Sequence, residues 1–160
     1  MVKRAFRIEA RLGVPAPQLM VWEALADLEA WADWNPFYPK VEGQLRIGGP
    51  LALTEAPLGG EPALVRATIV DWTPEMQILW RANERYGMIQ RLHYLEIDKL
   101  TDEACIISNG EDWFGRLAPF VSRPRRRAIR AGLEAMNEAL RDRAVARWRD
   151  QGGAPTSGGR

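Results

Sequence analysis

The chain has 160 residues, of which 46% are hydrophobic, and its 22 basic and 21 acidic residues nearly cancel. This length and apolar content predict one domain with a hydrophobic core, and the balanced charge excludes a global field that would draw the protein to nucleic acid or anionic lipid. A lone cysteine, Cys105, and the lack of any apolar run of signal-peptide or membrane-spanning type exclude an internal disulfide framework and predict a cytoplasmic protein without integral membrane association.

The N-terminal part of the chain combines a strand pattern with a helical one. Residues 4–13 alternate apolar and charged side chains, which is the period of a half-buried strand, and Pro15 and Pro17 end it. Residues 16–34 then repeat apolar side chains at helical spacing, with the prolines at or before the first turn, where they are best tolerated. We expect one strand followed by two short helices.

The middle of the chain, from Tyr38 to Trp113, is mostly strand-like. Turn signals break it at residues 48–50, 56–62, 73–75 and 98–103. Six strands with short connections are expected from these breaks, and they predict an antiparallel meander.

The last part of the domain predicts one long helix, from about Leu117 to Trp148. Apolar side chains recur there every three or four residues, so the helix must lay an apolar stripe on the sheet. Residues 151–160 have no apolar period and are rich in Gly, Pro and Ser, which predicts a disordered tail. The expected domain therefore spans residues 1–150.

A sheet that curves around one long helix cannot touch it everywhere, and the gap can become a pocket. The order of these elements and several short motifs resemble the helix-grip fold of the START/SRPBCC superfamily, which is birch-pollen-allergen-like, and within it the bacterial polyketide cyclase/dehydrase-like branch. The motifs are "WNPF" at 34–37, the glycine pair at 43 and 48, "ILW" at 78–80, "HYLEI" at 93–97, "GEDWFG" at 110–115 and "GLEAMNEAL" at 132–140.

This resemblance covers roughly residues 4 to 149. It implies an α+β fold in which a curved antiparallel sheet of about seven strands wraps around a long C-terminal helix, with two short helices between strands 1 and 2. It also implies an apolar ligand cavity more firmly than it implies any reaction.

The "WNPF" corner has a structural explanation. Pro36 biases Asn35 toward an extended conformation and stops the second short helix, while the Asn35 amide can bond local backbone. Trp34 either caps the mouth of a pocket or packs against the neighbouring helix. Gly43 and Gly48 are expected to serve a bend and a turn.

Strand alternation selects the residues that would line the cavity. Arg91, His93, Leu95 and Ile97 share one face of their strand, and a second set on the next strand shares another: Ile107, Asn109, Glu111 and Trp113. If the turn closes this hairpin in register, both sets face the same side. His93 is then expected opposite Ile107 or Asn109, with Glu111 beside or diagonal to Arg91.

Two interpretations of these polar residues remain open. In the first, an Arg91–Glu111 ion pair and a His93–Asn109 hydrogen bond satisfy polar groups inside a partly dry cavity. In the second, His93 is a general acid or base, oriented by Glu111, that acts on a polyketide-like or other carbonyl substrate. The candidate ligand-binding residues are Trp34, Trp80, Arg91, His93, Leu95, Ile107, Asn109, Glu111, Trp113 and Met136.

Other kinds of site are not supported by the sequence. One histidine and one cysteine provide no metal-ligand cluster, and no nucleotide-binding or nucleophile-elbow motif is present, so no cofactor is expected. The basic run at residues 122–130 is interpreted as a solvated helix face. Its alternative, contact with an anionic surface or nucleic acid, would usually require a larger patch and a more basic whole domain.

The favoured function is a binding module that carries or sequesters a small hydrophobic or amphipathic molecule, lipid- or polyketide-like. The rival is an enzyme of the cyclase or dehydratase type that uses His93 and Glu111 in the same cavity. A regulatory interaction protein is less supported, because no amphipathic groove segment stands outside the expected fold. A homodimer is left open.

Overall fold

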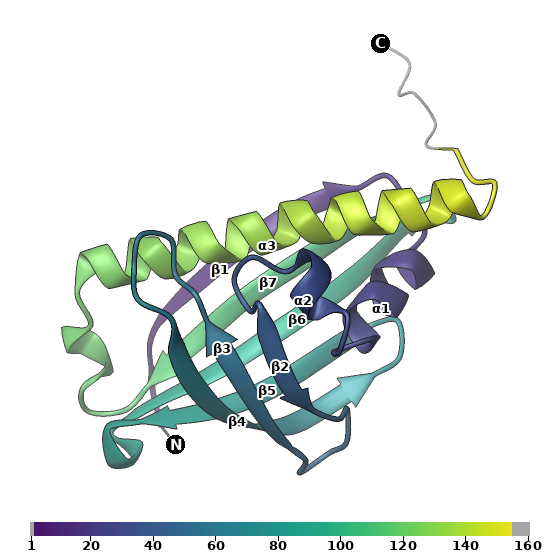
Figure 1. The fold of residues 1–160 in the computed structure, drawn as a ribbon. Coiled ribbons are helices and arrows are strands. Elements are labelled where there is room, and N and C mark those ends of the chain that lie inside the picture. The colour runs from purple at the N-terminus through teal and green to yellow at the C-terminus, as the bar shows by residue number, and fades with distance from the viewer. Residues whose placement is uncertain (1, 155–160) are drawn as a thin grey trace.

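A computed structural model describes residues 2–154, and in that part of the chain one curved antiparallel sheet of seven strands wraps around a long helix (Figure 1). The elements in chain order are β1 (Arg4–Val14), α1 (Gln18–Ala26), α2 (Trp31–Trp34), β2 (Lys40–Gly43), β3 (Pro50–Glu55), β4 (Ala63–Thr73), β5 (Gln77–Glu84), η1 (Arg85–Gly87), β6 (Ile89–Thr101), β7 (Ala104–Phe114), η2 (Ala118–Phe120) and α3 (Arg123–Asp150). The expected α+β helix-grip fold, with two short helices between strands 1 and 2, is confirmed.

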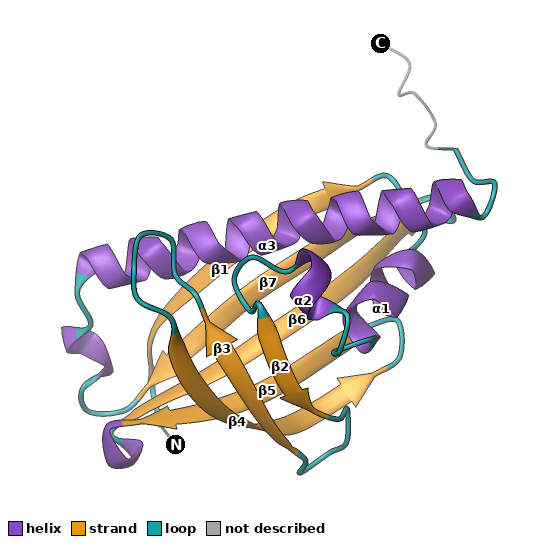
Figure 2. Cartoon of the chain, in the orientation of Figure 1, coloured by secondary structure: helices purple, strands orange, loops and turns teal. Residues whose placement is uncertain are grey.

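The sheet order is β1-β7-β6-β5-β4-β3-β2, so the first strand pairs with the last and the remaining strands follow as a meander. This order leaves β1 and β2 at the two edges and places β6 near the middle (Figure 2). Side chains that point from β5, β6 and β7 toward α3 therefore lie on the concave face of the curved sheet.

Helix α3 lays its apolar stripe on the sheet as predicted, with Ile129, Leu133 and Met136 buried. The predicted start at Leu117 is wrong, because the helix begins at Arg123. Proline lacks an amide hydrogen and disfavours a helical residue before it, so the prolines at 119 and 124 confine Ala118–Phe120 to a separate 3-10 turn. The Ser122 hydroxyl then caps α3 by accepting a hydrogen bond from the backbone N–H of Arg125.

The hairpin between β6 and β7 has a different register from the expected one. His93 lies opposite Glu111, not Ile107 or Asn109, because β6 continues to Thr101 and β7 begins at Ala104, which shortens the turn to two residues. The shift is an even number of residues, so every side chain keeps its predicted face.

The corner after α2 turns the chain into the space between the sheet and α3. As predicted, the Asn35 side chain bonds local backbone: its Oδ1 accepts hydrogen bonds from the N–H groups of Phe37 and Tyr38 at 3.0 and 2.9 Å. The Phe37 ring then packs on α3 at Gly132, where a Cβ would collide with it. Gly43 and Gly48 have φ of +141° and +76°, as suits a bend and a turn.

The described end of the chain continues from α3. The backbone N–H groups of Gln151 and Gly153 donate to the carbonyls of Arg147 and Trp148, so these residues close the last turn of the helix. Most of the expected tail, residues 155–160, lies outside the described residues.

Candidate ligand-binding site

A buried arginine near the start of β6 binds three carboxylates. Arg91 on β6 is 3% exposed, and its Nη2 lies 2.7 Å from Glu111 on β7 and 2.6 Å from Glu55 on β3. Its Nη1 lies 2.9 Å from Glu84 on β5. The predicted Arg91–Glu111 ion pair is thus present within a larger cluster. A guanidinium removed from water needs such partners, because a buried unpaired charge costs several kcal/mol.

The carboxylates of this cluster differ in proton affinity. Burial by itself would raise the pKa of Glu111, but the charge of Arg91 and a hydrogen bond with His93 outweigh it and lower that pKa to about 2. At Glu55 burial dominates over the attraction of Arg91 and raises the pKa. Glu111 is therefore held as an anion, while Glu55 accepts a proton more readily.

The single histidine joins the arginine cluster to a chain of amides. His93 Nε2 lies 2.7 Å from Asn109 Oδ1, which is the predicted contact. On the other side of the ring, Nδ1 lies 3.2 Å from the Tyr38 hydroxyl and 3.3 Å from Glu111 Oε1. The imidazole also stacks on Trp80, with ring centroids 4.0 Å apart and planes 11° from parallel. The ring is therefore held on both edges and on one face.

A backbone carbonyl sets the direction of the amide chain. The carbonyl of Ala10 can only accept, so Asn137 on α3 must present Nδ2 to it, at 3.0 Å. Asn137 Oδ1 then accepts from Asn109 Nδ2 at 3.1 Å, which leaves Asn109 Oδ1 to accept from His93. His93 Nε2 therefore carries a proton. In the neutral ring Nδ1 accepts from Tyr38, and in the doubly protonated ring Nδ1–H donates to Glu111.

An aromatic shell surrounds the cluster. The guanidinium carbon of Arg91 lies 4.7 Å from the centroid of Trp113, and the Trp113 indole N–H donates to Glu111 at 2.9 Å. Burial, together with the charge of Glu55, raises the pKa of Tyr38 well above its usual value, so its hydroxyl stays protonated and can donate. These groups make the interior polar at one point and apolar around it.

The predicted lining residues fall into three groups. Six of them form the connected cluster: Trp80, Arg91, His93, Asn109, Glu111 and Trp113. Leu95, Ile107 and Met136 are fully buried in the surrounding core. Trp34 lies on α2 and packs against Trp31.

Four residues of the cluster were missed by reasoning from the sequence. Glu55 follows Leu51 and Leu53 on the buried face of β3, and Asn137 lies within the apolar stripe of α3. In both elements a polar side chain interrupts a series of apolar positions, and this interruption is visible in the sequence. Tyr38 gave no such signal, because it precedes β2 in the corner. Glu84 stands at the end of β5 and reaches Arg91 from there.

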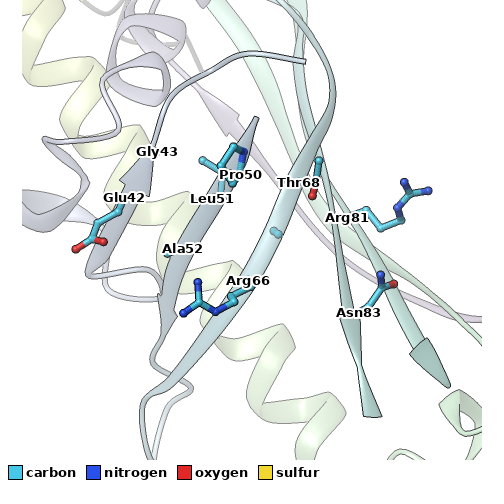
Figure 3. A pocket seen from close by; sticks show the side chains of 10 residues that line it. Glu42, Gly43, Pro50, Leu51, Ala52, Arg66, Thr68, Arg81 and Asn83 are labelled. Atoms are coloured by element: carbon cyan, nitrogen blue, oxygen red, sulfur yellow. The ribbon is translucent and has the colours of Figure 1, made fainter. Parts of the chain in front are cut away.

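Two hollows of the described structure are lined by residues outside this cluster. One of about 660 Å³ is on the face of the sheet turned away from α3, where the exposed side chains of Arg66, Arg81 and Asn83 line it (Figure 3). Another of about 370 Å³ lies at the end of the sheet between η1 and η2. Between the sheet and α3, the rings of Phe37 and Tyr38 occupy part of the space. A hollow of about 220 Å³ lies between β1 and α3, with Leu12 and Asn137 in its wall.

Residues 2–154 contain neither a metal-ligating cluster nor a membrane-spanning helix. No group of three or more His, Cys, Asp or Glu side chains is arranged there to hold a metal ion. In the same part of the chain, each helix is too short or too polar to cross a membrane.

Comparison with known proteins places this geometry in context. A family profile described as polyketide cyclase/dehydrase and lipid transport matches residues 5–147. The Zhui aromatase/cyclase from Streptomyces sp. R1128 is similar in structure, with 24% identity, a TM-score of 0.75 and coverage of 93% of this chain and 99% of that one. A comparison with curated protein sequences gives no match.

Two further solved structures share the architecture. A START superfamily protein from Mycobacterium smegmatis has 16% identity and a TM-score of 0.68, with 86% of this chain and 96% of that chain covered. A hypothetical protein from Helicobacter pylori has 17% identity and a TM-score of 0.72, with 88% and 89% covered. At these identities the likeness establishes the fold.

Proposed function

The chain belongs to the polyketide cyclase/dehydrase and lipid transport family, and we propose that it binds a small hydrophobic or aromatic molecule, lipid- or polyketide-like, between the sheet and α3. The observation that carries this proposal is a pair of buried donors at the corner: Trp34 Nε1 and Asn35 Nδ2 have no hydrogen-bond partner among the described residues. A buried donor without a partner costs about 1–3 kcal/mol, and an oxygen of a bound molecule would recover it.

The same corner is where the interior can open. The rings of Phe37 and Tyr38 occupy the space that a ligand would need, and the Tyr38 hydroxyl ends at His93 Nδ1. Outward movement of residues 36–38 would uncover the cluster around Arg91. A carbonyl or hydroxyl group of the ligand would then replace the Tyr38 hydroxyl, while the aromatic shell covers the apolar remainder.

Binding is favoured over catalysis because the cluster is already satisfied. Arg91 and His93 lower the pKa of Glu111 to about 2 against the effect of burial, so this carboxylate stabilises positive charge and does not exchange protons near neutral pH. His93 has hydrogen-bond partners at both ring nitrogens. A carrier needs such fixed groups only to orient its cargo.

Tryptophan fluorescence quenching across a panel of ligands matched in size tests the proposal. Phenolic or carbonyl-bearing probes should bind more tightly than aliphatic ones, because they supply the missing hydrogen bonds. Trp34→Phe keeps a ring but removes the N–H, so it should erase much of this preference. Trp72→Phe is the matched control, since Trp72 stacks on Trp22 away from the cluster. A panel without any binder, or equal losses in both variants, would overturn the proposal.

His93→Phe separates orientation from packing. The substitution should weaken the binding of polar probes about tenfold more than the binding of apolar ones. This difference corresponds to one lost hydrogen bond of roughly 1.4 kcal/mol. Equal losses for both kinds of probe would mean that His93 only packs. Native mass spectrometry of freshly purified protein would identify any ligand that co-purifies.

A second candidate function is an enzyme of the cyclase or dehydratase type. The observation that favours it is the position of His93 Nδ1, which faces both the Tyr38 hydroxyl and Glu111 within 3.3 Å. Nδ1 could take a proton from a substrate, and the anionic Glu111 would stabilise the imidazolium. If His93→Gln keeps binding but abolishes turnover of a polyketide-like carbonyl substrate, this candidate replaces the carrier. Turnover unaffected by His93→Gln would rule it out.

A further inference from the structure

One end of the molecule concentrates positive charge. The 3-10 helices η1 and η2 and the start of α3 meet at the same end of the sheet (Figure 2), and a hydrogen bond from the Leu117 N–H to the Met88 carbonyl joins the first two. Segments 84–90 and 114–130 together carry seven arginines and one acidic residue, Glu84, although the whole chain has a net charge of only +1. We call this region the basic end.

The fold gives hydrogen-bond partners to Arg125, Arg126 and Arg130, which bind Glu84, the Val121 carbonyl and the Glu9 carbonyl. It does not explain the other four arginines. The amino end of a helix carries partial positive charge and favours acidic side chains, yet the first turn of α3 has none. Arg123 stands in this first turn and Arg127 follows in the next one. Both are exposed and without an ion pair among the described residues, as are Arg85 and Arg116 on the neighbouring segments. Glu84 does not compensate them, because it is shared between Arg91 and Arg125.

Exposed apolar side chains stand among the arginines. Phe120 on η2 is 81% exposed, and Tyr86 on η1 is fully exposed, with Met88 beside it also exposed. Arg85 and Tyr86 have φ of +49° and +57°, a left-handed conformation that costs free energy in residues other than glycine. Between the two tips lies the hollow of about 370 Å³, with Ile89 and Leu117 in its wall.

We propose that the basic end is a docking surface for a bilayer that contains anionic lipids. Arginines would contact the lipid phosphates, and the two aromatic tips would enter the headgroup region, where amphipathic and aromatic side chains are most stable. The run at 122–130 alone is typical of a solvated face, but η1 adds Arg85 and Tyr86 to it and makes a larger patch. Apolar tips beside a hollow favour lipid over nucleic acid. The proposal does not depend on what binds in the interior.

Co-sedimentation of the full chain with vesicles tests this surface. Vesicles of phosphatidylcholine with about one-third phosphatidylserine should bind the protein at least tenfold more tightly than phosphatidylcholine alone, and raising the salt from about 0.1 M to about 1 M should release it. Arg127→Glu should weaken binding about fivefold or more, since each arginine near an anionic surface contributes about that factor. Phe120→Ser should also weaken it, and this loss should persist at low salt.

Two control variants change an exposed apolar side chain and an arginine away from the basic end. Leu100→Ser removes an exposed apolar side chain from the far end of β6, and Arg143→Glu reverses a charge in the later half of α3. Both should bind vesicles like the parent protein, and thermal melts should show that all four variants are folded. Absence of vesicle binding, or equal losses in test and control variants, overturns the proposal. Binding to an RNA oligonucleotide without vesicle binding overturns it in favour of nucleic acid.

Discussion

Asn109 accepts a hydrogen bond from His93 at 2.7 Å, and through Asn137 it is tied to the carbonyl of Ala10 on β1. Three strands and α3 thus define which imidazole nitrogen carries the proton. Because the Ala10 carbonyl can only accept, the hydrogen bonds from His93 through Asn109 and Asn137 to Ala10 all run in one direction.

The first prediction concerns the proton on His93. In the neutral ring Nε2 should be protonated and Nδ1 should be the acceptor, because Asn109 presents its oxygen. Nitrogen-15 NMR of the imidazole measures this directly, and the signals need no assignment since the chain has one histidine. Asn109→Asp keeps an acceptor and should keep the pattern. A ring protonated at Nδ1 alone would show that the amide chain runs the other way.

The second prediction concerns Asn137. Asn137→Leu keeps the branched arrangement of side-chain heavy atoms but leaves the Asn109 amide and the Ala10 carbonyl without their partner in a buried place. Each unsatisfied group costs about 1–3 kcal/mol, so the free energy of unfolding should fall by about 2–5 kcal/mol. Urea denaturation measures the loss. Asn83→Leu, an exposed position on β5, should change stability by less than about 0.5 kcal/mol. Equal losses of stability in the Asn137→Leu and Asn83→Leu variants would contradict the role assigned to the hydrogen-bonded amides.

The third prediction concerns pH. The pKa of Glu111 lies below its usual value of 4.5, at about 2, so its contribution to stability is present above 4.5 and is lost as pH falls toward 2. The pKa of Glu55 lies above 4.5, so its contribution runs the other way and stability declines as pH rises from 4.5 through the folded-state value. The urea midpoint of the parent protein should therefore pass through a maximum in the weakly acidic range.

Two variants separate the loss of stability at acid pH from the decline at higher pH. Glu55→Gln should remove the decline on the alkaline side of the maximum, because it no longer takes up a proton on folding. Glu111→Gln should reduce the loss of stability that occurs as pH falls from 4.5 toward 2. It should also lower the free energy of unfolding near neutral pH by about 3–5 kcal/mol, since it leaves Arg91 short of a buried partner. Asp112 adds to the same loss at acid pH, because hydrogen bonds and charge from Arg7 lower its pKa despite burial. Identical pH profiles for parent and Glu55→Gln would contradict the raised pKa.

The fourth prediction concerns the contact between the corner and α3. A Cβ at Gly132 would collide with the Phe37 ring, so Gly132→Ala should destabilise the fold by about 1–3 kcal/mol although alanine favours a helix. Gly13→Ala is the matched control, because that position on β1 has no atom within 4 Å of an added Cβ. Thermal melting compares the two. A Gly132→Ala protein as stable as the control would show that Phe37 moves freely, which would also ease ligand entry at the corner.

Local patterns accounted for much of the fold. The alternation in β6 and β7 predicted which side chains face α3, and the apolar period of α3 predicted its buried stripe, because both depend on the fixed geometry of one element. The bonds from Asn35 to the backbone of Phe37 and Tyr38 followed from adjacent residues. The arginine–glutamate and histidine–asparagine contacts were foreseen as well, since an even shift in register keeps the faces.

The sequence by itself therefore determined the family of fold, the faces of the strands and the chemistry of one face. Only the tertiary structure decided the partners: that Glu55 and Tyr38 reach the residues of β6, that Asn137 ties His93 to β1, and that η1 meets η2 at the basic end. These contacts join segments far apart in the chain, and they depend on how tightly the sheet curves and how short each turn is. Neither quantity is encoded in a local period, because both result from the packing of the whole sheet around α3.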